Sequence, residues 1–205
     1  MKKIENRQEQ QDRKNKKTRN QIILGILLIS VMVISTFGYA LRQEREEKVN
    51  YNGFSFVKVN NGWQVQNQPF SLVTRYLPAE TESINSKGIF SAEITNFANK
   101  QLYFVAFSSS EKAAISEIAR NIPLLRAQPV CLEEDSNRTE CFELPLKNCF
   151  DDSVMVISQI KQEQNQSAPE ERVYKERKCI FITADSENIL KAADRFLFAL
   201  YSIQQ

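Results

Sequence analysis

A run of uncharged residues near the N-terminus constrains this 205-residue chain more than any other feature. No charged side chain occurs from Asn20 to Leu41, and residues 22–40 are almost continuously Ile, Leu, Val, Met, Phe and small residues. Nineteen helical residues extend about 28 Å, close to the roughly 30 Å hydrocarbon thickness of a bilayer. We therefore expect residues 21–41 to form a transmembrane helix, which makes the lipid bilayer a predicted partner.

The charges on either side of this run predict its orientation. Residues 1–20 carry eight basic and three acidic side chains, a net charge of +5, whereas residues 41–205 carry a net charge of −3. Because an excess of basic residues marks the cytoplasmic side, residues 1–20 are expected to form a cytoplasmic tail. The protein would then lie in the cytoplasmic membrane, with its N-terminus inside and its C-terminal domain outside.

Two further inferences follow from the same region. Gly38, Tyr39 and Ala40 could serve as a signal-peptidase site, but a twenty-residue polar leader and a long apolar run favour an uncleaved anchor. The external part is mildly acidic and lacks the basic excess that binding to phosphate backbones favours. Nucleic acid is therefore not an expected partner.

After a charged linker or stalk at residues 42–50, residues 51–205 predict one external α/β domain, with an α+β arrangement also possible. Two β-prone runs flank Asn60-Asn61-Gly62 and predict an N-terminal hairpin. Periodicity predicts further strands over residues 70–77, 101–107, 127–131, 154–160 and 178–183, and helices over 89–98, 109–122 and 186–203. The strand at 101–107, the serine-capped helix and the strand at 127–131 form a β–α–β unit, and residues 161–172 read as a solvated loop. The expected architecture is a mixed sheet with a C-terminal helix.

All four cysteines lie beyond the apolar run, at Cys131, Cys141, Cys149 and Cys179. An even number confined to the external part predicts two disulfides in an oxidising compartment. Of the three pairings, we favour Cys131–Cys141 with Cys149–Cys179. A zinc site of four thiolates and free core thiols are the alternatives, although the spacing contains no C-x-x-C pair.

Two acceptor triplets for N-glycosylation fall in predicted surface loops of the external domain. They are Asn137-Arg138-Thr139 and Asn165-Gln166-Ser167. Their external placement makes Asn137 and Asn165 candidate glycosylation sites.

The chain contains no histidine, which excludes many kinds of catalytic and metal site. Ser–His–Asp and Cys–His catalysis, His-ligated metal centres and c-type haem attachment all require an imidazole. No dinucleotide-binding, P-loop or G-x-S-x-G motif occurs either, so we expect no cofactor, no metal and no assigned catalytic residue.

Carboxylate chemistry and an aromatic platform remain as candidates. The acidic clusters are Glu133 to Asp135, Asp151-Asp152 and Glu170-Glu171, which could act as paired acids or calcium ligands, although solvated loops are the expected interpretation. The aromatic residues of the hairpin, Tyr51, Phe54, Phe56 and Trp63, could bind carbohydrate but more often represent core packing.

Three segments carry a resemblance to a known group of proteins. They are residues 129–149 with Pro129-Val130-Cys131, Cys141 and Cys149, the closing segment 179–203, and YNGFSFVKVNNGWQV at 51–65. Together they resemble small membrane-anchored surface proteins of Woesearchaeota-type archaea. The resemblance implies an archaeal cell-surface setting in which all four cysteines belong to the pattern. It implies no catalytic residue.

The expected function is therefore that of a membrane-anchored cell-envelope protein, not an enzyme, whose disulfide-linked domain contacts an envelope protein or glycan. The alternative is a ligand-binding or carboxylate-dependent hydrolytic domain. Its cleft would lie at the carboxyl ends of the strands, near Ser108 to Ser110 and Asp185, where open α/β sheets usually bind ligands.

Overall fold

The computed structural model describes residues 19–35, 47–89, 91, 94–160 and 170–204. The chain divides into two compact units, with the boundary between Arg45 and Glu46. The first unit contains a helix over residues 19–35, whose apolar side chains are exposed. Within the described residues, no helix combines the length and hydropathy needed to cross a bilayer. Residues 36–41 of the predicted span lie outside the described part of the chain.

The second unit begins with a four-stranded antiparallel sheet in the order β1-β2-β3-β4. Its strands are β1 (Lys48–Tyr51), β2 (Phe54–Val59), β3 (Gly62–Gln66) and β4 (Val73–Thr74). The turn between β1 and β2 is Asn52-Gly53, with both φ angles positive, as tight two-residue hairpins require. Gly62 is needed for close pairing, because a Cβ at this position would overlap the carbonyl oxygen of Thr74.

A six-stranded mixed sheet follows in the order β5-β11-β12-β10-β6-β7. Its strands are β5 (Asn85–Lys87), β6 (Gln101–Val105), β7 (Arg126–Pro129), β10 (Val154–Gln159), β11 (Arg172–Glu176) and β12 (Cys179–Ala184). β7, β6, β10 and β12 are mutually parallel, whereas β11 and β5 run in the opposite direction. The predicted β–α–β unit is confirmed as β6, α3 (Ser109–Asn121) and parallel β7.

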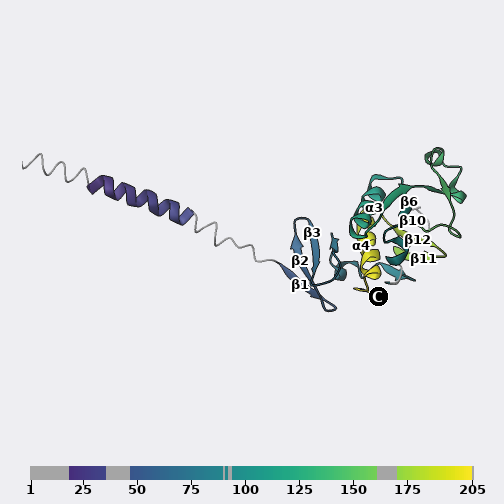
Figure 1. The fold of residues 1–205 in the computed structure, drawn as a ribbon, viewed down its shortest axis with the longest axis horizontal. Coiled ribbons are helices and arrows are strands. Elements are labelled where there is room, and N and C mark those ends of the chain that lie inside the picture. The colour runs from purple at the N-terminus through teal and green to yellow at the C-terminus, as the bar shows by residue number, and fades with distance from the viewer. Residues whose placement is uncertain (1–18, 36–46, 90, 92–93, 161–169, 205) are drawn as a thin grey trace, which may run out of the picture. The chain divides into compact units, whose positions relative to one another are not determined.

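Helix α4 (Ile189–Leu200) lies between the two sheets (Figure 1). Phe198 contacts Phe56 of the first sheet edge to face, with ring centroids 6.1 Å apart. Phe196 belongs to the same core cluster as Ile180 and Ile182 of β12, so the helix also covers the second sheet. Ten of the twelve residues of α4 are buried, which differs from the single apolar face predicted for it.

The two faces of the six-stranded sheet have different cores. Along β10, Met155 and Ile157 point towards the helices, whereas Val154 and Val156 point to the opposite face, as the alternation of a strand requires. On that opposite face they cluster with Cys179 and residues of the segment after β7. This segment contains β8 (Cys131–Leu132), paired in parallel with β9 (Leu146–Lys147), and the 3-10 turns η3 (Glu133–Asp135) and η4 (Thr139–Cys141).

The α/β class and most core elements are as predicted, but five segments differ. The predicted strand 70–77 contains only β4, followed by the 3-10 turn η1 (Pro78–Thr81), and the predicted helix 89–98 contains only α2 (Ile94–Phe97) among its described residues. The predicted linker 42–50 overlaps β1 from Lys48 onward, and the predicted loop 161–172 ends in β11, while residues 161–169 lie outside the described residues. The C-terminal helix is shorter than 186–203, because Asp185 accepts hydrogen bonds from the N–H groups of Glu187 and Asn188 in a turn that precedes α4.

β4 is short because side chains replace its backbone partners. Asn121 of α3 accepts a hydrogen bond from the N–H of Val73 at 2.7 Å and donates one to its carbonyl oxygen at 2.8 Å. The next two N–H groups, of Arg75 and Tyr76, donate to Asp194 of α4. These backbone groups are therefore hydrogen-bonded without a second strand beside β4, which pairs only with β3 in this sheet.

Candidate functional site

Residues 131–153, named here the lobe, contain one of the two predicted disulfides and are attached to the six-stranded sheet by the other. Cys131 is bonded to Cys141, with Cα atoms 5.6 Å apart, and Cys149 to Cys179 of β12, with Cα atoms 5.1 Å apart. No free cysteine remains among the described residues, so the predicted pairing is confirmed and the four-thiolate zinc site is wrong. The lobe forms the green loops at the upper right of the second unit in Figure 1.

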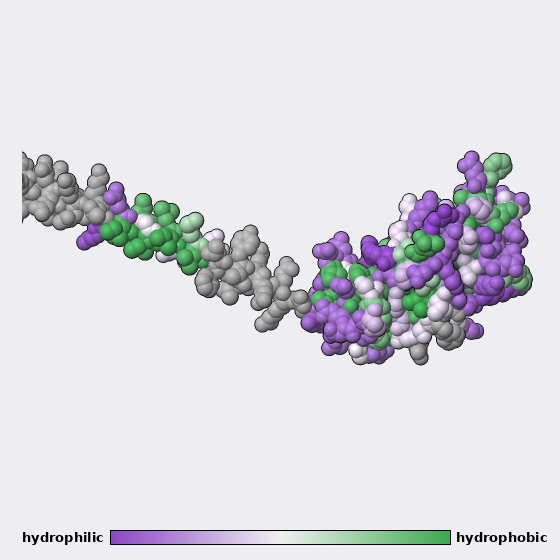
Figure 2. All heavy atoms as spheres, viewed as in Figure 1, coloured by the Kyte–Doolittle hydropathy of each residue, from purple (hydrophilic) through white to green (hydrophobic). Residues whose placement is uncertain are grey.

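The lobe exposes three large apolar side chains to solvent. Phe142 is 93% exposed, Phe150 is 62% exposed and Leu146 is 48% exposed. Cys141 precedes Phe142 and Cys149 precedes Phe150, so each exposed aromatic ring is adjacent to a cross-linked residue. Figure 2 shows apolar side chains beside polar ones at this end of the unit. Exposed aromatic residues on a constrained backbone are typical of protein-contact surfaces.

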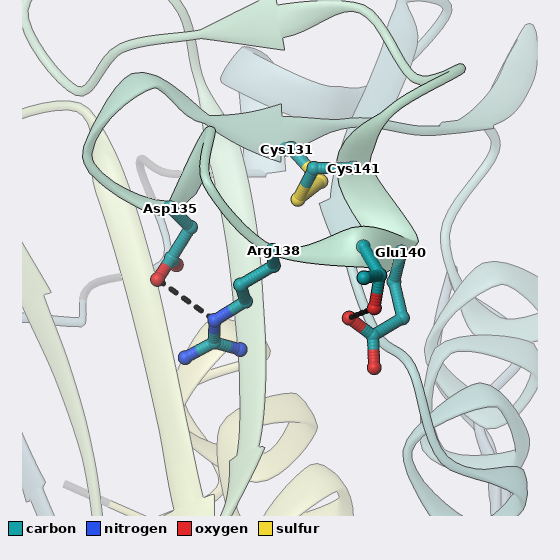
Figure 3. Close-up of a disulfide and its surroundings, with 6 residues drawn as sticks. Cys131, Asp135, Arg138, Glu140 and Cys141 are labelled. Atoms are coloured by element: carbon teal, nitrogen blue, oxygen red, sulfur yellow. Dashed lines mark hydrogen bonds and ion pairs between the residues drawn. A yellow bond between two sulfur atoms is a disulfide. The ribbon is translucent and has the colours of Figure 1, made fainter.

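The lobe is also strongly acidic. It contains seven acidic and two basic side chains, a net charge of −5. Arg138 is ion-paired with Asp135 at 3.0 Å, next to the Cys131–Cys141 disulfide (Figure 3), and Lys147 with Asp152 at 3.0 Å. These two ion pairs involve both basic side chains of the lobe, which therefore keeps its net charge of −5.

A second candidate is the strand-end cleft, a hollow of about 530 Å³ at the carboxyl ends of β6 and β10. In the order of the sheet, β7 lies beyond β6 on one side and β12 lies beyond β10 on the other, so the strand order reverses between β6 and β10. Open α/β sheets usually bind ligands at such a reversal. The residues around it combine an apolar floor with polar walls and include Val105, Phe107, Ser108, Glu111, Asp135, Arg138, Glu140, Val156, Ser158 and Gln159. The cleft lies beside Ser108, as the alternative prediction expected, but Asp185, the other residue of that prediction, is not among the residues around it.

Several polar side chains around this cleft form hydrogen bonds within the domain. Ser108 caps α3, and its capping box includes Glu111, whose carboxylate accepts hydrogen bonds from the N–H groups of Phe107, Ser108 and Gln159. The side-chain amide of Gln159 donates to the hydroxyls of Ser108 and Ser110. Glu111 therefore cannot readily serve as a proton donor or metal ligand, since its oxygens are already occupied.

Several of the other predicted acidic residues accept hydrogen bonds from asparagine side chains. Glu133 accepts from Asn148 at 3.4 Å, Glu170 from Asn85 at 3.3 Å and Glu171 from Asn188 at 2.9 Å. In the described part of the chain, no group of three or more His, Cys, Asp or Glu residues is arranged to hold a metal ion.

The hairpin aromatics do not form a surface platform. Phe56 is fully buried, and the partly buried rings of Tyr51, Phe54 and Trp63 pack against the same core. The structural interpretation of these four residues therefore holds.

The two predicted glycosylation sites differ in what the structure says of them. Asn137 is exposed in a turn of the lobe, as an acceptor asparagine must be. Asn165 lies outside the described residues. Both remain predictions.

Sequence reasoning missed one unusual carboxyl group, Asp194 in α4. Its side chain is fully buried; Oδ2 accepts hydrogen bonds from the N–H groups of Arg75 and Tyr76, and Oδ1 has no hydrogen-bond partner among the described residues. Burial, with the nearby charge of Glu117, raises the pKa of Asp194 to about 8. The signal available in the sequence was an Asp-Arg pair inside an otherwise apolar helix. Although raised pKa values are typical of active sites, a side chain with no access to solvent cannot meet a substrate.

Comparisons with known proteins identified no relative. No family model, no curated protein sequence and no solved structure matched the chain.

Proposed function

We propose that this protein is anchored in the cytoplasmic membrane and presents its disulfide-linked domain outside the cell for contact with another envelope protein. The observation that carries this proposal is the pair of exposed phenylalanines, Phe142 and Phe150, on a cross-linked lobe. Large exposed aromatic rings lose favourable burial unless a partner covers them. The two disulfides agree with an oxidising external compartment.

The proposed anchor is the span 21–41. Its support is the absence of charge from Asn20 to Leu41 and the exposure of eleven large apolar side chains between Ile22 and Ile34. Such a surface is stable when lipid surrounds it. The archaeal setting implied by the resemblance of residues 51–203 is part of the same proposal.

Site-specific photo-cross-linking on intact membranes tests the contact. With p-benzoylphenylalanine in place of Phe142, irradiation is expected to link the chain to one defined protein. The matched control carries the same group in place of Leu125, which is 78% exposed but lies outside the lobe. Equal cross-linking from both positions, or none from Phe142, would contradict the proposed function.

A glycan ligand in the strand-end cleft is the second candidate function. Its support is the position of the cleft at the ends of β6 and β10, with hydroxyl, amide and carboxylate groups above an apolar floor. Filling the cleft by Ser158→Trp should abolish any thermal shift that an oligosaccharide panel produces with the wild-type protein. A shift that survives this substitution would place the ligand elsewhere.

A further inference from the structure

We infer that the lobe receives a basic segment of a protein partner, with Lys or Arg side chains flanking apolar ones. This inference rests on the proposed function and adds the chemistry of the partner. Three features of the lobe carry it: the aromatic rings on a cross-linked backbone, a small pocket beside Phe150 and the sign of the charge around them.

The backbone that carries the two aromatic rings is held in place before any partner arrives. The backbone beside Phe142 is fixed by the Cys131–Cys141 disulfide, and Cys131 pairs with Leu146 in the β8–β9 ladder. The backbone of Phe150 is fixed by Cys149–Cys179 and by the hydrogen bond from its N–H to Asn148 at 3.0 Å. Because little conformational entropy remains to be lost, contacts made by these rings favour binding more than contacts of a mobile loop would.

The lobe pocket is a hollow of about 280 Å³ beside Cys149 and Phe150. Leu132, Cys149 and Phe150 supply its apolar part, and its polar lining comprises Glu133, Glu134, Asp151, Asn148 and Lys147. Lys147 is ion-paired with Asp152 at 3.0 Å, and the three acidic residues of the lining exceed this one basic residue. Lys and Arg side chains have a matching division, since an apolar stem carries a charged head. The pocket therefore suits a long basic side chain better than a purely apolar or acidic one.

The charge of the surroundings selects the same partner. The turn between β11 and β12 adds Arg177, whose guanidinium lies 3.7 Å from the centre of the Phe150 ring, and Lys178, which donates to the carbonyl oxygen of Asp151. With these two residues included, the net charge of lobe and turn is still −3. A negative surface accelerates encounter with a basic partner and disfavours an acidic one.

The negative charge of the lobe disfavours two other possible partners of its exposed apolar side chains, a second copy of this chain and a lipid surface. A second copy of this chain would bring one lobe of net charge −5 against another. An anionic lipid surface would be repelled in the same way. A basic protein segment remains as the occupant that satisfies both the apolar and the charged groups.

The inference is tested with full-length protein in zwitterionic nanodiscs and a labelled heptapeptide of alternating Lys and Leu, with binding to empty nanodiscs subtracted. Fluorescence anisotropy should show saturable binding that weakens with salt. Phe142→Ser combined with Phe150→Ser should weaken it at least tenfold, whereas the control Leu125→Ser should change it less than twofold. Glu133→Gln with Glu134→Gln should also weaken it, but Glu187→Gln, an exposed acid outside the lobe, should not.

The outcomes separate this inference from the proposed function. Equal binding of a Glu and Leu heptapeptide, or Lys and Leu binding that the phenylalanine pair does not affect, would overturn the basic partner. So would a change of oligomeric state caused by the phenylalanine pair, which would identify a second copy as the occupant. If the peptide fails to bind but Phe142 still cross-links to one protein, only the partner chemistry is wrong. If neither occurs, the proposed function fails as well.

Discussion

Asp194 is a fully buried carboxyl group with only one of its two oxygens hydrogen-bonded among the described residues. Its two hydrogen bonds hold the segment after β4 against α4, at 2.9 Å from the N–H of Arg75 and 2.8 Å from that of Tyr76. Its other oxygen has no hydrogen-bond partner among the described residues, and Glu117 lies near enough to repel the ionised form. Protonation relieves both penalties, which is why the pKa of Asp194 is raised to about 8.

The raised pKa predicts a specific dependence of stability on pH. Between about pH 4 and pH 8 the folded protein holds a proton at Asp194 that the unfolded chain has released. The stability contributed by Asp194 is therefore complete below the unfolded value of 3.8 and is lost as the pH rises through the folded value. Asp194→Asn removes this titration. The free energy of unfolding of the variant should therefore rise relative to that of the wild type by up to about 1.4 kcal/mol per pH unit across this window.

Urea unfolding at pH 5, 7 and 9 measures this difference. Glu187→Gln serves as the control, because Glu187 is exposed and its removal should change stability equally at each pH. A constant difference between Asp194→Asn and the wild type at all three pH values would contradict the assignment.

At the scale of elements, α4 is the centre of the domain rather than a covering helix. It contacts the four-stranded sheet through Phe198 and the six-stranded sheet through Phe196, so one helix contributes to both cores. Phe97 also contacts Phe196 edge to face, with ring centroids 6.5 Å apart. The two sheets therefore depend on the same few side chains for their packing.

Phe196→Ala should cost about 3–5 kcal/mol of folding stability, because the ring is fully buried and its removal leaves a cavity. Leu190→Ala in the same helix should cost less, since Leu190 is only partly buried. Thermal unfolding followed by circular dichroism measures both. An unshifted melting temperature for Phe196→Ala would mean that the ring does not pack as described.

The two disulfides should contribute unequally to stability. Cys149–Cys179 closes a separation of 30 residues, whereas Cys131–Cys141 closes one of 10. In the chain-entropy description the longer loop contributes about 1 kcal/mol more. Replacing Cys149 and Cys179 by Ser should therefore cost roughly 2–5 kcal/mol and lower the melting temperature more than replacing Cys131 and Cys141. The reverse order, or four free thiols in mass mapping of unreduced peptides, would contradict this account.

At the scale of the molecule, the two units differ in the solvent that their surfaces suit. The second unit buries its core between two sheets, whereas the helix over residues 19–35 exposes large apolar side chains. The proposed topology places a bilayer around the first unit and water around the second.

Protease added to intact cells tests that topology. We expect digestion of residues 41–205 while an epitope at residue 1 survives, because the tail would be cytoplasmic. Permeabilised cells provide the control, in which both ends should be digested. Loss of the N-terminal epitope with survival of the C-terminal one would reverse the orientation.

Local patterns in the sequence determined the class of the domain, the β–α–β unit, the serine cap of α3 and the expectation that the four cysteines form two disulfides. The class and the β–α–β unit follow from the spacing of apolar residues, and the cap follows from Ser108 and Glu111, which lie three residues apart. The disulfides follow from the count of four cysteines. The hairpin of β2 and β3 is the one predicted from Asn60-Asn61-Gly62 and is confirmed. The hairpin of β1 and β2, with its turn at Asn52-Gly53, was not predicted, because residues 42–50 were expected to form a linker or stalk.

Only the tertiary structure decided the remaining features, because they depend on segments far apart in the chain. β11 is short and charged, and it becomes a strand by pairing with β12 and β5. The pKa of Asp194 is raised by burial within the folded domain and by the charge of Glu117 of α3, although the hydrogen bonds from the loop after β4 act in the opposite direction. Phe142 and Phe150 have no local pattern that distinguishes them from the buried phenylalanines of α4. Their exposure follows from where two cross-links hold the lobe, which no stretch of sequence encodes by itself.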